Sequence, residues 1–364
     1  MNFKNIIIDT PSLLIDKYTL LKNIETMSAY TKENDISIRP HFKSHKIPEI
    51  AKIQIKYGAI GVCVATLHEA EIMVKNKIKG VLLTTPITNT NNKARLASLV
   101  KSSKSFKVII DSLYGLEFMD DIAKNNNLKV NILIDCDIMK IGTNKKSRTG
   151  CRNIEEIINL ASIVKSKSTL VYRGITAYAG DIQHINNYNK RKVETNKRHN
   201  YLKNIKEKLT ELKLKPKIIS GGGTGSYDID TKSGLFTELQ AGSYIFNDVE
   251  YAKVSIYKTK SNPFKNGLFI ASTIISIIDK YNYIIDAGLK ALSSDSELLP
   301  RPIGNVPLGT KYNFMGDEHG KITLPKNSKK KLAYGDIVLI QPAHCDPTVN
   351  LYDRCYLFTN NKIS

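Results

Sequence analysis

The sequence predicts a (β/α)8 barrel of the TIM type, followed by a domain of β-strands. Up to roughly residue 255, eight β-rich segments alternate with amphipathic segments, and beyond it β-rich segments follow one another with Gly and Pro turns between them. Strands that alternate with helices form parallel sheets, whereas strands joined by turns form antiparallel ones. We therefore expect an α/β barrel with a separate β domain.

The predicted barrel strands are short. They span 36–39, 59–64, 80–84, 106–110, 130–135, 171–178, 216–220 and 237–242. Between most of them lie amphipathic segments, such as 67–77, 92–100 and 153–165, whose apolar residues recur at three and four positions. In such a barrel the loops after the strands gather at one end and carry the reactive groups. We assign residues 22–254 to the barrel.

The predicted β domain comprises residues 255–364. Its strands include 272–278, 283–287 and 337–341. The opening stretch 10–16 precedes the first long helix, and we expect it to pair into this domain. Residues 1–21 are therefore assigned to the β domain as well.

Composition limits the class of protein. The chain has 364 residues, 41% of them hydrophobic, which is enough for a large core. No apolar run approaches the ~20 residues of a membrane span, and residues 1–9 lack the features of a secretory signal, so we expect a cytoplasmic protein without a membrane partner. The five cysteines are odd in number and lack CxxC spacing, which predicts reduced thiols.

The formal net charge of +20 raises the question of nucleic-acid binding. Lys and Arg are spread along the whole chain, and no RNP, zinc-finger or helix-turn-helix signature accompanies them. We therefore expect no nucleic-acid partner. Two interpretations of the charge stay open: a modest attraction for anionic substrates, and no functional role.

A first candidate site follows the strand 36–39, where Lys43 stands between His41 and His45. Alternate residues of an extended chain face the same side, so the three side chains are expected together. A lysine amine with neighbouring cations and partial desolvation has a lowered pKa and becomes nucleophilic at neutral pH. Lys43 is therefore a candidate for holding a cofactor through its amine, although most lysines are solvated surface groups.

A second candidate is the glycine-rich run 220–226 after the seventh barrel strand, with Gly242, Ser243 and Tyr244 after the eighth. Successive glycines allow backbone N–H groups to converge on a phosphate, and barrels favour these two loops for phosphate sites. A flexible turn without a ligand is the alternative. Two such turns together favour a phosphate-bearing cofactor.

His344 and Asp346 are candidate metal ligands. They follow the predicted strand 337–341, and in an extended chain they would face the same side while Cys345 points away. Two protein ligands leave positions open for water and substrate, as a catalytic ion requires. A His and a carboxylate two residues apart also occur by chance.

Taken in order, these motifs resemble those of the D-threonine aldolase and D-serine dehydratase family, metal-activated pyridoxal-phosphate enzymes with the fold of alanine racemase. The shared landmarks lie at 9–11, 39–46, 61–65, 148–150, 174–178, 183–184, 220–224, 286–290, 318–320 and 344–350. The resemblance covers nearly the whole chain. It implies an alanine racemase-like fold, pyridoxal 5'-phosphate and a divalent metal ion as cofactors, a D-amino acid substrate and a homodimer.

The resemblance also implies roles for individual residues. Lys43 is implied as the cofactor lysine, with Arg148 near the phenolic oxygen of the cofactor and with His41 beside it. Tyr178 is implied as a catalytic residue that lines the cofactor and helps to orient the substrate. His184, which follows Gln183, is implied as the catalytic base. The residues implied around the phosphate are Gly222, Gly223, Thr224, Gly242, Ser243 and Tyr244.

The metal motif separates two branches of this family. Its dehydratases typically present His-x-Cys, a soft pair suited to zinc, whereas His344-Cys345-Asp346 resembles the aldolases that use manganese, with magnesium, cobalt and zinc as alternatives. We therefore expect cleavage of D-threonine or D-3-hydroxyaspartate to glycine plus acetaldehyde or glyoxylate.

Three other functions are weighed against the aldolase. A dehydratase would use the same residues to give a 2-keto acid and ammonia. A racemase needs no metal pair. A non-enzymatic pyridoxal-phosphate homeostasis protein shares the barrel and the lysine but lacks a β domain such as residues 255–364.

Overall fold

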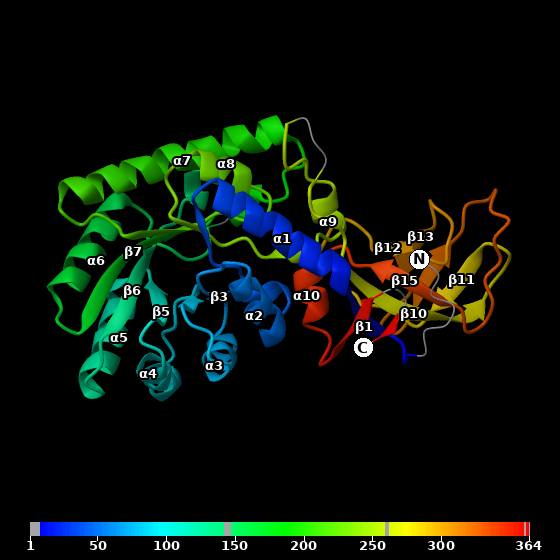
Figure 1. Ribbon diagram of the computed structural model, residues 1–364, viewed down its shortest axis with the longest axis horizontal. Coiled ribbons are helices and arrows are strands. Elements are labelled where there is room, and N and C mark those ends of the chain that lie inside the picture. Colours follow the sequence, from blue (N-terminus) through cyan, green and yellow to red (C-terminus); the bar gives the residue numbers. More distant parts are fainter. Residues whose placement is uncertain (1–7, 142–146, 259–261, 360–361, 364) are drawn as a thin grey trace. The chain divides into compact units, whose positions relative to one another are not determined.

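The computed structural model describes residues 8–141, 147–258, 262–359 and 362–363, which form two compact units (Figure 1). The barrel unit comprises Met27–Gly242 and Ile256–Lys260. The β unit comprises Met1–Thr26, Ser243–Ser255 and Ser261–Ser364. Within the described residues, no helix has both the length and the apolar character needed to cross a membrane.

The barrel unit is built on eight parallel strands in the order β2-β9-β8-β7-β6-β5-β4-β3. A bridge between His41 and Cys63 joins the two ends of this order, so the sheet closes on itself. Each predicted strand segment overlaps one of these strands, and the predicted barrel is confirmed. The strands are β2 (Ser37–Ile38), β3 (Cys63–Val64), β4 (Leu82–Leu83), β5 (Lys107–Ile110), β6 (Val130–Asp135), β7 (Leu170–Ala177), β8 (Ile218–Gly221) and β9 (Glu238–Leu239).

Helices lie outside the ring of strands, as α4, α5 and α6 show in Figure 1. Side-chain caps begin several of them: Thr66 and Glu69 form a capping box for α3, and Asn187 caps α7. The helices are α2 (Pro48–Lys56), α3 (Leu67–Lys75), α4 (Lys93–Ser102), α5 (Leu113–Asn125), α6 (Ile154–Ser166), α7 (Tyr188–Glu211) and α8 (Tyr227–Lys232); α1 (Lys17–Glu33) begins in the β unit and ends in the barrel unit. Short 3-10 helices are η1 (Phe42–Ser44), η2 (Thr90–Asn92), η3 (Met139–Ile141) and η4 (Gly180–Ile182).

The barrel core is apolar between strands and helices and partly polar inside the ring. Val64, Ile132 and Leu202 belong to one large buried cluster. Among the strands, Arg39 Nε donates to Glu238 Oε1 at 2.8 Å, and both side chains are buried. Because all eight strands are parallel, the loops that follow β2, β7, β8 and β9 open at the same end of the barrel.

The β unit is a nine-stranded, mostly antiparallel sheet in the described residues. In it, β1 pairs antiparallel with β10 and parallel with β16. Ser243–Ser255 belongs to this unit because Val249 N donates to Pro342 O and Cys345 N donates to Asp248 Oδ2. The elements are β1 (Ser12–Asp16), η5 (Ser243–Ile245), α9 (Val249–Ala252), β10 (Leu268–Ile277), β11 (Asn282–Ile285), β12 (Arg301–Ile303), β13 (Lys311–Phe314), β14 (Gly320–Thr323), β15 (Ile337–Gln341), α10 (Cys345–Val349), β16 (Cys355–Thr359) and β17 (Lys362–Ile363).

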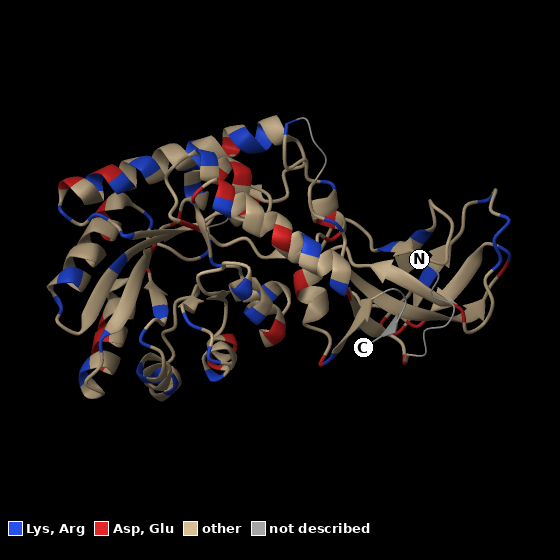
Figure 2. Ribbon diagram, viewed as in Figure 1, with Lys and Arg blue, Asp and Glu red and all other residues tan. Residues whose placement is uncertain are grey.

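The positive charge of the chain is distributed over both units. Figure 2 shows Lys and Arg interleaved with Asp and Glu along α7, and further Lys and Arg in the β unit. Many of the cations pair locally with carboxylates, as Arg95 does with Glu71 at 2.7 Å.

Candidate cofactor and metal site

Lys43 lies in the turn that follows β2. The turn is the 3-10 helix η1, and its N-cap His41 accepts a hydrogen bond from Lys43 N at 3.4 Å. His45 is fully buried, and its ring lies edge-on to Phe42 with the centroids 5.0 Å apart. The expectation that the lysine and the two histidines share one face of an extended strand is therefore wrong, because alternate residues of a 3-10 turn do not face the same side.

The turn after β9 packs directly against η1. A Cβ atom at Gly242 would lie 2.5 Å from Ser44 Oγ and 3.0 Å from His41 O, so this position has room only for glycine. The Ser44 hydroxyl is buried and has no hydrogen-bond partner among the described residues. Buried hydroxyls are normally satisfied, so a bound polar group is the kind of partner that this one lacks.

The glycine loop, defined as Gly222–Ser226, follows β8 and is buried throughout. Gly222 has a φ of 71°, in the left-handed region that favours glycine. The strand β9 lies between β8 and β2 in the sheet. The glycine loop, Gly242 and η1 thus follow three adjacent strands, and the structure brings Lys43, the glycine loop and Gly242 to one end of the barrel unit.

Arg148 and Tyr178 approach each other at Gly180. A Cβ atom at Gly180 would lie 2.9 Å from Arg148 Nη2 and 3.1 Å from Tyr178 Cε1. The loop that carries Arg148 is anchored to β6, since Thr149 Oγ1 donates to Asp135 Oδ2 at 2.7 Å. Tyr178 directly follows β7, the neighbour of β8. Residues 142–146, in the approach to Arg148, lie outside the described residues.

His184 lies two residues beyond η4 and is exposed. The preceding residue, Gln183, is buried. Its Nε2 donates to Ser226 Oγ at 2.9 Å, and its Oε1 accepts from Gly225 N at 2.9 Å. Gln183 therefore ties the segment that carries His184 to the glycine loop.

In the β unit, His344 and Asp346 lie at the start of a helix. His344 is the extended N-cap of α10, and Asp346 belongs to the first turn. The expectation of an extended chain through this motif is wrong. Proline is tolerated in a first helical turn, where Pro347 stands, and Asp248 Oδ2 accepts from Cys345 N at 2.8 Å.

Three carboxylates surround His344. Asp295 Oδ2 lies 2.6 Å from His344 Nδ1. Burial lowers the pKa of this imidazole, but the carboxylates of Asp346, Asp295 and Asp248 raise it, and the net shift is upward. The same negative surroundings favour a divalent cation. Within the β unit, Asp346 Oδ1 also accepts from Ser243 Oγ at 3.4 Å.

Cys345 lies between the two candidate metal ligands in the sequence. Its thiol is fully buried and donates to Asp346 Oδ1 at 3.3 Å. Burial, with the nearby Asp248 and Asp346, raises the pKa of this thiol well above its usual value, which disfavours the thiolate that metals bind. Across the described ranges, no group of three or more His, Cys, Asp and Glu side chains is arranged to hold a metal. The candidate metal ligands of the β unit are thus the imidazole of His344 and the carboxylate of Asp346.

Three side chains of these sites carry no role predicted from the sequence. Asp295 stands 49 residues before its partner His344, and no motif marks it. Ser44 was noted only as part of the Lys43 cluster. Gln183 was noted only as the neighbour of His184, although a buried amide between two motifs is a common way of fixing them.

The chain is similar to known proteins over nearly its full length. Residues 15–249 match the family described as "Alanine racemase, N-terminal domain", and residues 267–358 match "Putative serine dehydratase domain". A 3-hydroxy-D-aspartate aldolase of Paracoccus denitrificans (strain Pd 1222) is 31% identical over 98% of this chain and 90% of its own length. A D-threonine aldolase of Arthrobacter sp. is 30% identical, covering 95% of this chain and 88% of its own.

A solved structure agrees with these relatives. The crystal structure of a D-threonine aldolase from Filomicrobium marinum superposes with a TM-score of 0.91 at 28% identity. The match covers 98% of this chain and 94% of that one.

Proposed function

Because the chain belongs to the D-threonine aldolase and D-serine dehydratase family, whose barrel is that of the alanine racemases, we propose that it is a pyridoxal-phosphate- and metal-dependent aldolase. The enzyme is a lyase that cleaves D-β-hydroxy amino acids, D-threonine or D-3-hydroxyaspartate, to glycine plus acetaldehyde or glyoxylate. The observation that carries the proposal is the packing of the Lys43 turn against the Gly242 turn, beside the glycine loop.

Lys43 would hold pyridoxal phosphate through its amine. The residues of the barrel end fit such a group, because they combine an amine, a buried hydroxyl without a partner in the described part of the chain, and two tight glycine turns. Arg148 would lie near the phenolic oxygen, with His41 and Tyr178 beside the ring. The phosphate would be received by Gly222, Gly223, Thr224, Gly242, Ser243 and Tyr244. When bound, this cofactor supplies a sink for the electrons of the breaking Cα–Cβ bond.

His344 and Asp346 would hold the divalent ion. One imidazole and one carboxylate suit a hard or borderline cation, and the buried Cys345 thiol removes the soft ligand that would favour zinc. Manganese is therefore favoured, with magnesium, cobalt and zinc as alternatives. When bound, the ion supplies a positive charge that lowers the pKa of the β-hydroxyl of the substrate.

His184 would accept the proton of the β-hydroxyl. An imidazole exchanges protons near neutral pH, and the exposed position of His184 allows the proton to pass on to water. Gln183 holds this segment in place through its two bonds to the glycine loop. Loss of the hydroxyl proton and cleavage of the Cα–Cβ bond release the aldehyde, and Cα takes up one proton to give glycine.

The experiment that tests the function is product analysis. The purified protein, loaded with pyridoxal phosphate, is incubated with D-threonine or D-3-hydroxyaspartate, with and without manganese. We expect glycine and the aldehyde in equal amounts, in the presence of manganese. A 2-keto acid with ammonia would instead establish the dehydratase, which the match of residues 267–358 to the serine dehydratase domain keeps as the second candidate. Sedimentation of the same preparation tests the proposed homodimer.

A further inference from the structure

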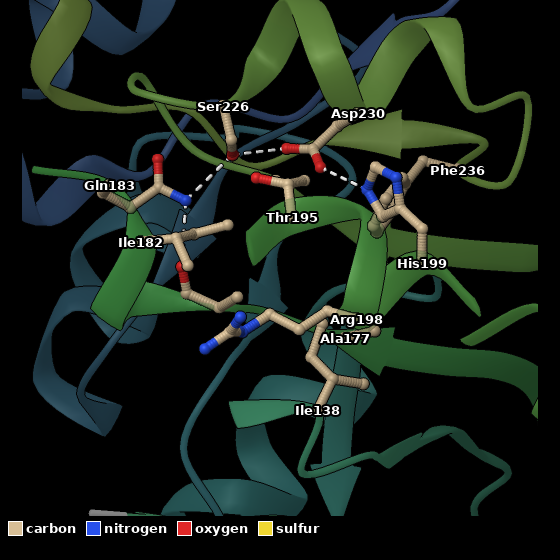
Figure 3. A pocket seen from close by; sticks show the side chains of 12 residues that line it. Ile138, Ala177, Ile182, Gln183, Thr195, Arg198, His199, Ser226, Asp230 and Phe236 are labelled. Atoms are coloured by element: carbon tan, nitrogen blue, oxygen red, sulfur yellow. Dashed lines mark hydrogen bonds and ion pairs between the residues drawn. The ribbon is translucent and has the colours of Figure 1, made fainter. Parts of the chain in front are cut away.

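A polar network lies buried beneath the glycine loop. Its side chains are those of Gln183, at the end of η4, and His199, in α7, together with Ser226 and Asp230 (Figure 3). Ser226 is the last residue of the glycine loop and Asp230 lies in α8, which follows it directly. The four side chains surround a small cavity of about 10 Å³ that is also lined by Thr195 and Arg198. All four side chains are at least nine-tenths buried, with exposed fractions of 0% to 7%.

The network is continuous from one side of the loop to the other. Gln183 Nε2 donates to Ser226 Oγ at 2.9 Å, and Ser226 Oγ donates to Asp230 Oδ2 at 2.5 Å. The other carboxylate oxygen, Oδ1, lies 2.8 Å from His199 Nε2. Figure 3 shows these side chains in a row from the glutamine to the histidine. Each polar side-chain atom of Gln183, Ser226 and Asp230 has a partner, which is the condition under which a buried network fixes one conformation.

Two backbone N–H groups of the glycine loop end in this network. Gly225 N donates to Gln183 Oε1 at 2.9 Å, and Gly223 N donates to Ser226 Oγ at 3.4 Å. The glutamine also fills the space next to the loop, since a Cβ atom at Gly223 would lie 2.5 Å from Gln183 Oε1. Rotation of the loop peptides is therefore limited by the network on one side and by close packing on the other.

We propose that Asp230 is a positioning residue for the phosphate of the cofactor. The carboxylate, held by His199, fixes Ser226; Ser226 and Gln183 in turn fix the peptides of the glycine loop in the orientation that receives a phosphate. This inference rests on the proposed function, in which Gly222, Gly223 and Thr224 bind that phosphate. It adds that Asp230, which does not itself touch the phosphate, contributes to the affinity of the protein for the phosphorylated cofactor.

The same network supports the segment of the base. Gln183 Nε2 also donates to Ala179 O at 2.9 Å, within the turn that runs from Tyr178 to His184. A change at Asp230 is thus transmitted to the glycine loop first and to the His184 segment through the glutamine. A change at Asp230 should therefore weaken the binding of the phosphate more than the binding of the cofactor ring.

The test compares pyridoxal phosphate with pyridoxal, which lacks the phosphate. In Asp230→Asn one oxygen becomes an amide nitrogen, which cannot accept from Ser226 or His199. We expect the dissociation constant for pyridoxal phosphate, measured from the absorbance of the bound chromophore, to rise about tenfold. The constant for pyridoxal should stay within about twofold, so the preference for the phosphorylated form falls.

The matched control is Asp120→Asn. Asp120 is buried like Asp230, at 4% exposed, and binds Thr169, Lys124 and Lys167 at the amino end of β7, opposite to the glycine loop. This variant should lose stability without any change in the preference for pyridoxal phosphate over pyridoxal. A loss of preference in it would overturn the inference, because any buried defect would then have the same effect.

Ser226→Ala provides a second variant in case Asp230→Asn does not fold. It removes the hydroxyl between Gln183 and Asp230 and should lower the same preference. An unchanged preference in whichever of the two variants folds would overturn the inference alone. A wild-type chain that binds no pyridoxal phosphate would overturn the proposed function, and this inference with it.

Discussion

The single residue on which the proposed chemistry depends is Lys43. Its backbone is fixed by a hydrogen bond to His41 Nδ1 and by the 3-10 turn in which it lies. The sequence marks Lys43 as a candidate but does not predict its local conformation, because a three-residue turn leaves no periodic pattern. The neighbouring Gly242 has no room for a side chain. The turn that carries Lys43 is thus held in place by packing against Gly242, in a loop that is far away in the sequence.

Lys43→Ala should abolish the absorbance at roughly 410–430 nm that a protein-bound pyridoxal chromophore gives, because the amine that holds the cofactor is removed. The measurement is the absorption spectrum after addition of pyridoxal phosphate and gel filtration. Lys52→Ala is the control, since Lys52 is an exposed lysine of α2 bound to Asn76. Persistent absorbance in the Lys43 variant would mean that another lysine holds the cofactor.

Asp295→Asn should weaken metal binding. Asp295 Oδ2 accepts a hydrogen bond from His344 Nδ1, which leaves Nε2 as the nitrogen that would face a metal ion. Loss of such a partner costs about 10- to 100-fold in metal affinity. Titration calorimetry with manganese measures the effect. The exposed turn residue Asp279 provides the control variant Asp279→Asn. Equal manganese affinity in the Asp295 variant and the wild type would remove Asp295 from the account of the metal site.

At the scale of the element, the short helix α8 carries a buried acid. Burial raises the pKa of Asp228 from 3.8 to about 6, against the opposing effects of Lys232, Arg191 and Tyr188. Because the pKa of Asp228 is higher in the folded state than in the unfolded state, the protonated carboxyl stabilises the fold. This stabilisation is fully present below the unfolded-state pKa of 3.8. This stability is lost as the pH rises through about 6.

Asp228→Asn should therefore gain stability relative to the wild type as the pH rises. Between pH 4.5 and pH 7.5 we expect a relative gain of roughly 2 kcal/mol in the free energy of unfolding, because the variant has no buried carboxyl to ionise. Denaturant unfolding at the two pH values measures it. Asp120→Asn, which removes an acid with a lowered pKa, should show no such gain. If the free energy of unfolding of the Asp228 variant differed from that of the wild type by the same amount at both pH values, the raised pKa of Asp228 would be contradicted.

The helix α10 illustrates what a sequence pattern leaves out. Alternation predicted His344 and Asp346 on one face of an extended segment, whereas the chain turns into a helix at Cys345. The cause is a contact with Asp248, 97 residues earlier, which caps the first N–H of that helix. The candidate ligands were identified by residue type, but their orientation depends on a long-range bond that spacing does not encode.

For the whole molecule, the order of strands and helices was predictable and the contacts among loops were not. Alternating β-rich and amphipathic segments indicated all eight barrel strands, even two-residue ones such as β2 and β9, because each stands between helical patterns. Pairs such as Arg39 with Glu238, 199 residues apart, follow from closure of the barrel. The network of Gln183, Ser226 and Asp230 likewise exists only once β7 and β8 are neighbours.

Removal of the metal should separate the two cofactors of the enzyme. Dialysis against a chelator should abolish turnover of D-threonine and D-3-hydroxyaspartate and leave the chromophore absorbance unchanged, because different residues are proposed to hold the metal and pyridoxal phosphate. Addition of manganese should restore the activity of the wild type, but it should not restore activity in the variant His344→Ala. Full turnover in the presence of the chelator would exclude the metal from the reaction.

The proposed reaction breaks the Cα–Cβ bond of the substrate. It is tested most directly with D-3-hydroxyaspartate labelled with carbon-13 at both Cα and Cβ, followed by carbon NMR of the reaction mixture. We predict that the one-bond coupling between the two labelled carbons disappears, because one label ends in glycine and the other in glyoxylate. Retention of that coupling in a keto-acid product would contradict the claim.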